Sequence, residues 1–138
     1  MEVKLAVLAD YANVTKEGKL NLLGLFNVLN VPNLPWTHPQ MQLVLVFESG
    51  PAEWDTVKKV EVKLFDEDAH EKFAMGADLR VPRGQSGKKV SINSIIFLNN
   101  LSFDVAGDYS FCVLVGGETK MEIPLAVNVV PRRDEGPG

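Results

Sequence analysis

The densest group of ionisable side chains in this 138-residue sequence runs from Asp66 to Glu71 and reads Asp-Glu-Asp-Ala-His-Glu. Carboxylates and imidazoles bind cations and act as general acids or bases. The segment lacks the ligand spacing of a calcium loop, and neighbouring strand residues point to opposite faces, so few of these groups should converge. We interpret it as a solvated hairpin turn. A loosely bound metal ion is the alternative, and we assign no metal ligand.

Other motifs give little support for catalysis. The two histidines, His38 and His70, stand outside familiar catalytic motifs, and the sequence has no Gly-x-Ser-x-Gly pattern. Cys112 lies between Phe111 and Val113, which predicts a small buried hydrophobe. Residues 84–89 contain a Gly-Lys pair but are too short for a phosphate-binding loop. We therefore predict a non-catalytic protein without a cofactor.

Four polar residues interrupt or flank the first two apolar runs: Asp10, Tyr11, Asn13 and Asn21. A buried polar side chain without a hydrogen-bond partner costs about 1–3 kcal/mol. We expect these residues to lock a first hairpin, with Asp10 or Asn13 capping the amides of its turn. The alternative is a small polar pocket at that end of the fold.

Trp36 is the strongest interaction candidate. It lies between two prolines in the segment 33–39, where the prolines predict a loop. Tryptophan is favoured at binding hot spots, although it could equally plug an open end of the fold. Trp54 is a weaker candidate of the same kind. The tentative ligand or partner contacts are therefore Trp36, His38, Asp10 and Tyr11.

Alternation of apolar and polar residues with a period of two dominates the chain and predicts strands. Turn residues such as those of segments 15–19, 66–68, 82–87 and 116–119 separate them. The sequence predicts an all-β antiparallel sandwich of about eight strands with immunoglobulin-like or related topology. It further predicts one domain over residues 1–130 and a disordered tail over 131–138. The expected strands cover residues 3–11, 20–31, 41–47, 59–64, 73–81, 90–101, 109–115 and 121–129.

Two segments have more apolar surface than an ordinary strand. The stretch 20–31 is apolar on both faces, so we expect a central, covered strand or one that meets another chain. The consecutive run from Ile95 to Leu98 predicts a bulge or a strand covered on both sides.

Bulk composition restricts the partners. The net charge is −4, from 18 acidic and 14 basic residues, and basic residues come only in pairs, which argues against nucleic acid. The single cysteine excludes an intrachain disulfide and is compatible with a reducing compartment. The amino terminus is not that of a signal peptide, and no apolar run reaches the 18 or so residues of a membrane span. We expect a cytoplasmic protein.

Two resemblances add to this interpretation. Tyr109, in the segment 107–111, resembles the tyrosine corner of immunoglobulin-like sandwiches, although Phe111 stands where antibody domains have a cysteine. The segments 8–14 and 18–26 are similar to the opening of a family of small uncharacterised prokaryotic proteins, and segments 37–39, 107–109 and 117–125 resemble its later parts. That resemblance implies a bacterial source and a standalone domain, and it supplies no activity, ligand or site residues.

Three functions remain open. The first is a non-catalytic interaction or assembly module whose partner is a second copy or another protein. The second is a small-ligand binding domain with a site near Trp36, His38 and the first hairpin. The third and weakest is an enzyme that uses Asp10, His38 or the turn from Asp66 to Glu71, which requires at least two of these groups to lie within hydrogen-bond reach.

Overall fold

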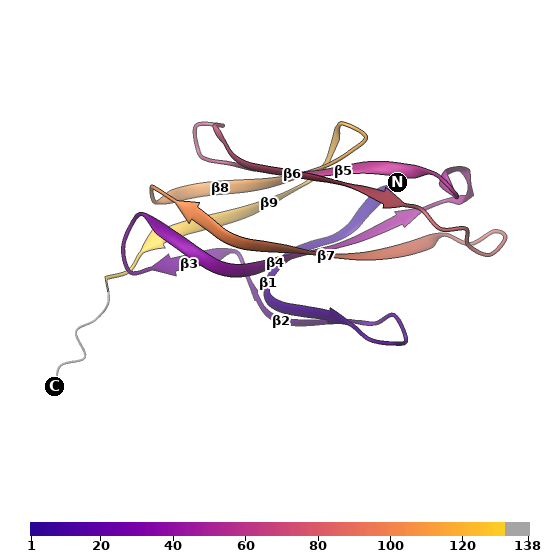
Figure 1. Ribbon diagram of the computed structural model, residues 1–138, viewed down its shortest axis with the longest axis horizontal. Coiled ribbons are helices and arrows are strands. Elements are labelled where there is room, and N and C mark those ends of the chain that lie inside the picture. Colours follow the sequence, from indigo (N-terminus) through magenta and orange to yellow (C-terminus); the bar gives the residue numbers. More distant parts are fainter. Residues whose placement is uncertain (132–138) are drawn as a thin grey trace.

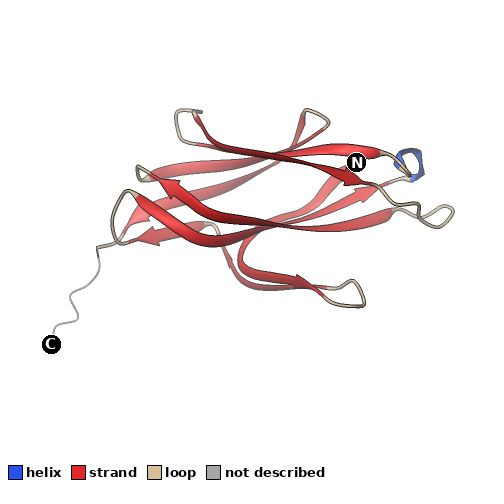
Figure 2. Ribbon diagram, in the orientation of Figure 1, coloured by secondary structure: helices blue, strands red, loops and turns tan. Residues whose placement is uncertain are grey.

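The computed structural model describes residues 1–131, which fold into a sandwich of two β-sheets (Figures 1 and 2). A single 3₁₀ turn, Pro51–Glu53, is the one helical element in this part of the chain, and it is too short to cross a membrane. The first sheet has the order β2-β1-β4-β7, and the second has the order β3-β9-β8-β5-β6. The strands are β1 (Glu2–Val14), β2 (Leu20–Phe26), β3 (Val28–Val31), β4 (Trp36–Ser49), β5 (Val57–Phe65), β6 (Glu71–Arg80), β7 (Val90–Phe103), β8 (Gly107–Val115) and β9 (Glu118–Val129).

The core lies between the two sheets, where the alternating apolar residues of the sequence meet. Leu43, Leu45 and Phe47 of β4 are at most 1% exposed. They belong to one cluster with Leu64 of β5 and Phe111 of β8. The period-two pattern therefore predicted correctly which residues of these strands point inward.

The expected single strand over residues 20–31 is wrong, and this accounts for nine strands instead of eight. The segment divides at Asn27: β2 pairs antiparallel with β1 in the first sheet, and β3 pairs parallel with β9 in the second. Both pieces are edge strands, not central ones. The two halves of the segment pack into different clusters, with Leu29 in the main core and Leu22 beneath the hairpin, while Leu23 and Leu25 on the other face of β2 stay exposed.

The hairpin of β1 and β2 leaves the first sheet and folds back over the outer face of that sheet, forming the lowest layer in Figure 1. Pairing of β1 with β4 ends at Ala9 and Gln42. Beyond that point the side chain of Gln42, 1% exposed, accepts a hydrogen bond from the backbone N–H of Ala12 at 2.7 Å. At the tip, Asn93 of β7 donates to the carbonyl of Gly18. The predicted turn at residues 15–19 is present, and Gly18 has a φ of 83°.

The expected loop over residues 33–39 is confirmed for residues 33–35 and wrong for residues 36–39, because β4 begins at Trp36. The register pairs His38 with Leu101 and Gln40 with Asn99, so Pro39 lies opposite Asn100. Asn100 has a φ of 57°, which departs from strand geometry. The missing N–H of Pro39 therefore falls where the ladder is already interrupted, and the strand tolerates the proline.

The predicted disordered tail over residues 131–138 lies outside the described residues except for Pro131, which is exposed and outside any strand.

Candidate functional site

Trp36 and His38 form one contact on β4. The indole Nε1 of Trp36 donates to Nδ1 of His38 at 3.3 Å, and the ring centroids are 6.4 Å apart. Trp36 is partly buried and packs against the main core. Burial lowers the pKa of His38, while the negative charge of Asp10 opposes the shift. The position of Trp36 favours the plug over an exposed contact residue, because its one polar group already has an internal partner.

The two remaining expected contact residues lie on the hairpin. Asp10 is exposed beside Gly24, and Tyr11 is 49% exposed opposite Leu23. Asp10 and His38 thus influence each other through charge, but neither belongs to the cavities described below.

The expected caps of the hairpin turn are wrong. The turn amide of Lys19 donates to the hydroxyl of Thr15 at 3.1 Å, so neither Asp10 nor Asn13 caps it. Asn13 instead accepts a hydrogen bond from the side-chain amide of Asn21 at 2.9 Å, one strand across. The expectation that polar residues lock this hairpin therefore holds for Asn13 and Asn21 alone.

More groups converge in the acidic turn than we expected. One ligand atom from each of Asp66, Asp68 and His70 lies within 4.8 Å of the others, a geometry that could hold a divalent cation. The Asp66 carboxylate already has internal partners, however. Its Oδ1 accepts from the backbone N–H groups of Asp68 and His70 at 2.9 and 2.8 Å, and Lys72 lies 3.6 Å from Oδ2. The His70 amide and then that of Asp68 hold the pKa of Asp66 below its usual value. These contacts explain the cluster as a locked turn.

The acidic turn also supports the chain before β8, a relationship that the sequence pattern did not indicate. Oε1 of Glu67 accepts from the backbone N–H of Asp108 at 2.7 Å. A Cβ at Gly107, whose φ is 148°, would lie 2.8 Å from the same oxygen. Tyr109, 4% exposed, donates from its hydroxyl to the carbonyl of Val105 at 2.7 Å. Glu67, Gly107 and Tyr109 border a cavity of about 220 Å³ at this end of the sandwich.

Cys112 is only partly buried, less than its neighbours on β8 predicted. Burial raises the pKa of its thiol, and the charge of Glu122 raises it further. The thiol is therefore protonated at neutral pH, which is the unreactive form.

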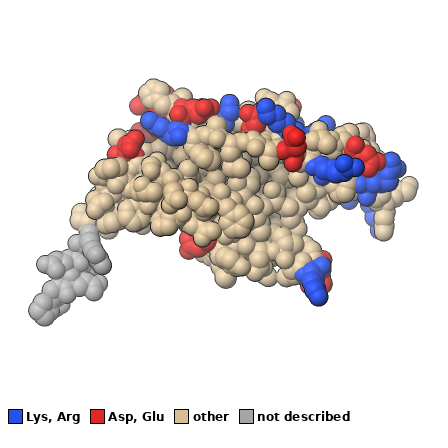
Figure 3. All heavy atoms as spheres, in the orientation of Figure 1, with Lys and Arg blue, Asp and Glu red and all other residues tan. Residues whose placement is uncertain are grey.

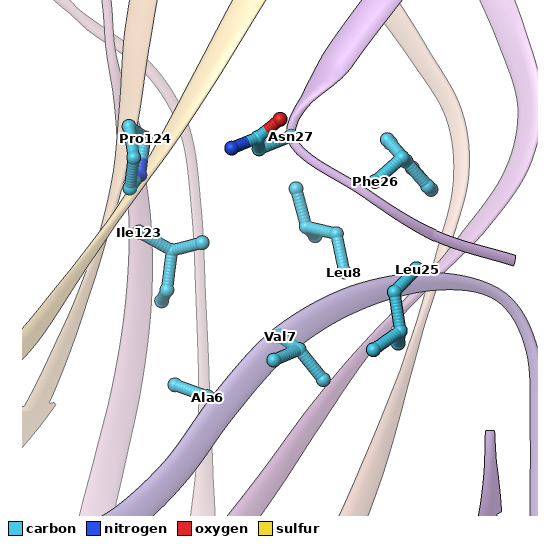
Figure 4. A pocket seen from close by; sticks show the side chains of 8 residues that line it. All are labelled: Ala6, Val7, Leu8, Leu25, Phe26, Asn27, Ile123 and Pro124. Carbon is cyan, nitrogen blue, oxygen red and sulfur yellow. The ribbon is translucent and has the colours of Figure 1, made fainter.

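A larger cavity, about 380 Å³, lies between two free strand edges (Figure 4). On one side, the edge of β1 that faces away from β4 has no strand partner before Leu8. On the other side, the edge of β9 that faces away from β8 has none before Ala126. Val7, Leu8 and Ile123 surround the space in Figure 4, with the amide of Asn27 at one end. Sequence reasoning missed this site, because it depends on where two edges of different sheets come to lie.

The first sheet and its hairpin contain several large apolar side chains that are about half exposed or more. Tyr11, Leu23 and Leu25 on the hairpin are 49%, 63% and 57% exposed, and Phe97 on β7 is 56% exposed. We call these four residues the apolar side. In Figure 3 charged side chains gather along the upper part of the view and at the hairpin tip, while the broad area between them is almost without charge.

Two sheets around one apolar core define an all-β sandwich protein. Within this class, the model of a family described as a family of unknown function (DUF6941) matches residues 4–128, and the chain belongs to that family. No curated protein matches the chain.

Proposed function

We propose that this protein is a non-catalytic β-sandwich module that self-associates into a homo-oligomer. The observation that carries the proposal is the apolar side, on which Tyr11, Leu23 and Leu25 are about half exposed or more. Apolar patches on soluble monomers rarely exceed a few hundred Å², and larger ones mark interaction surfaces. Because tyrosine and phenylalanine are favoured in interface cores, the composition of this surface fits a protein partner.

The distribution of charge supports a second copy as that partner. Strands β2, β3 and β7 contain no charged residue, and all three are edge strands. Natural proteins usually protect sheet edges with charged side chains, because an open edge pairs readily with another chain. Two copies that meet through uncharged strands avoid like-charge repulsion between those strands.

Light scattering of the eluting protein during size-exclusion chromatography tests the proposal. At micromolar concentration we expect a mass of at least two chains. High salt should leave it unchanged, because apolar contacts are not screened as ion pairs are. A monomer at every micromolar concentration would overturn the proposal.

We propose two finer points. The hydrogen bond from Tyr109 to a carbonyl four residues upstream supports an immunoglobulin-like tyrosine corner. The similarity of residues 8–14 and 18–26 to small prokaryotic proteins, together with a single cysteine, supports a bacterial cytoplasmic origin.

The cavity between β1 and β9 favours a second candidate function, the binding of a small apolar ligand. Its volume of about 380 Å³ falls within the range of ligand pockets, and apolar side chains with one amide line it. A fluorescent probe, anilinonaphthalene sulfonate, should bind the wild type and bind the filled variant Ala6→Leu at least several-fold more weakly. The exposed control Ala74→Leu should bind as the wild type does. Equal binding by all three proteins would exclude this cavity as the site.

A further inference from the structure

We propose that β7 makes the contact between copies, by pairing antiparallel with β7 of a second copy across a two-fold axis at Ile96. The two first sheets would then continue as one sheet through both copies. This inference rests on the proposed self-association and adds its strand, its orientation and its register.

The free edge of β7 is long and unprotected. Within residues 1–131, β4 is the one strand that pairs with β7, so the opposite edge of its 14 residues is open. None of these residues is charged. The other long edge strand, β6, has charged residues at both ends: Glu71, Lys72, Asp78 and Arg80. Charge on an edge prevents pairing with another chain, so β7 is the edge at which pairing remains possible.

The two faces of β7 are assigned by its pairing with β4. Ile96 and Leu98 pair with Leu43 and Met41, which are core residues, so these side chains point inward. Phe97 pairs with Gln42 and points to the outer face. Ile95, two residues earlier on the same strand, points to the same face. The hairpin packs over Ile95 and reaches Asn93, yet it leaves Phe97 56% exposed.

These faces restrict the register of self-pairing. In a continuous sheet, inward residues of one copy must lie opposite inward residues of the other, because paired residues share a face. The two-fold axis must therefore pass through a residue and not between two residues. An axis at Ile96 places Ile95 opposite Phe97 of the second copy, a pair of β-branched and aromatic side chains that stabilises antiparallel strands. It also places Asn93 opposite Asn99, so that amides meet amides.

The neighbouring registers match less well. An axis at Ile95 places Asn93 opposite Phe97, and an axis at Phe97 places Ile95 opposite Asn99. Both combine a polar with an apolar side chain on the outer face. On the outer face, the residues Asn93, Ile95, Phe97 and Asn99 are thus self-complementary about Ile96, whereas on the inner face Ser94 lies opposite Leu98. The match on the outer face favours a second copy of this strand as the occupant.

Substitution of Phe97 by lysine tests the strand. Two lysines would face each other diagonally across the axis at roughly 7–8 Å, with like charges. We expect the dissociation constant of the oligomer in sedimentation velocity to rise by at least about tenfold. The matched control is Val57→Lys on β5, where the exposed fraction is 58% against 56% for Phe97, and it should dissociate as the wild type does. Circular dichroism checks that both variants are folded.

Cysteine cross-linking tests the register. In a Cys112→Ser background, Ile96→Cys places two thiols on the axis, with Cβ atoms about 4.5–5.5 Å apart. Mild oxidation should therefore produce covalent dimers. The control is Ile92→Cys, because Ile92 and Ile96 both pack partly buried against the main core. Its two copies would lie eight residues apart, about 27 Å at 3.4 Å per residue, so they should not cross-link.

The outcomes separate this inference from the proposed function. A monomeric wild type overturns both. If the wild type is an oligomer and Phe97→Lys leaves it intact, self-association stands and pairing through β7 is overturned. The same conclusion follows if Leu23→Lys disrupts the oligomer and Phe97→Lys does not. Cross-linking at Ile92 in place of Ile96 overturns the register, and an oligomer found only with a different protein overturns the second copy as occupant.

Discussion

The side-chain amide of Asn93 on β7 donates a hydrogen bond to the backbone carbonyl of Gly18, with 3.1 Å between nitrogen and oxygen. This contact ties the tip of the first hairpin to an edge strand 75 residues later in the chain. Gln42 holds the same hairpin at its base, through the N–H of Ala12. The hairpin is thus attached at two points to the sheet that it covers, which fixes the position of the exposed residues on its outer side.

Replacement of Gln42 by leucine should lower the free energy of unfolding by about 1–3 kcal/mol. The leucine fills a similar volume but leaves the N–H of Ala12 without its acceptor in a buried position. Urea denaturation measures the change. Gln40→Leu on the exposed part of the same strand is the control and should change stability by less than about 0.5 kcal/mol. Equal stability of Gln42→Leu and the wild type would show that this hydrogen bond does not hold the hairpin.

Replacement of Tyr109 by phenylalanine should lower the free energy of unfolding by about 0.5–1.5 kcal/mol. The variant loses the hydrogen bond to Val105 but keeps the edge-to-face contact with Phe103, in which the ring centroids lie 5.1 Å apart. Tyr11→Phe removes an exposed hydroxyl and should be neutral. If the two variants were equally stable in urea, the corner would contribute no net stability.

The glycines of the first hairpin should respond differently to alanine. Gly18 has a φ of 83° and free space around it, so Gly18→Ala should cost about 1–2 kcal/mol from backbone strain alone. Gly24 has a φ of 67°, and an added Cβ would also overlap the carboxylate of Asp10, so Gly24→Ala should cost more. The double variant Asp10→Ala, Gly24→Ala should recover the difference in thermal or urea unfolding. If the double variant recovered no stability, the overlap with Asp10 would not be the cause of the extra loss of stability in Gly24→Ala.

His38 should make the free energy of unfolding depend on pH: it should fall as the pH decreases through 6.5, the usual pKa of histidine. Burial holds the pKa of His38 in the folded state below that value, so the unfolded chain binds the proton more readily. Protonation of Nδ1 also removes the acceptor that Trp36 uses. The contribution is therefore fully present above pH 6.5 and is lost as the pH falls toward the lowered pKa.

Urea midpoints on both sides of pH 6.5 measure this dependence. His38→Phe should have a smaller slope of stability against pH than the wild type. Asp10→Asn should have a larger one, because the charge of Asp10 partly offsets the effect of burial. If His38→Phe had the same slope of stability against pH as the wild type, groups other than His38 would cause the pH dependence.

Part of the candidate site could be predicted because it is local. Trp36 and His38 are two residues apart in the sequence, which was enough to place them at one site. That they share a face follows from β4, which begins at Trp36 where we expected a loop. The contact between Glu67 and Asp108 joins residues 41 positions apart, and no local pattern indicates it. The convergence of Asp66, Asp68 and His70 was missed for a related reason, because the turn bends the backbone away from strand geometry, and Ala69 takes a φ of 61°.

The sequence by itself determined most strands, most turns and the inward-facing residues, because a period of two and turn chemistry act over a few residues. The tertiary structure decided the division of residues 20–31 between two sheets and the folding of the first hairpin over its own sheet. It also decided that β7 is an open edge. An apolar strand has the same pattern whether another strand, a hairpin or a second chain covers it, since burial is non-directional and only the three-dimensional arrangement selects the partner.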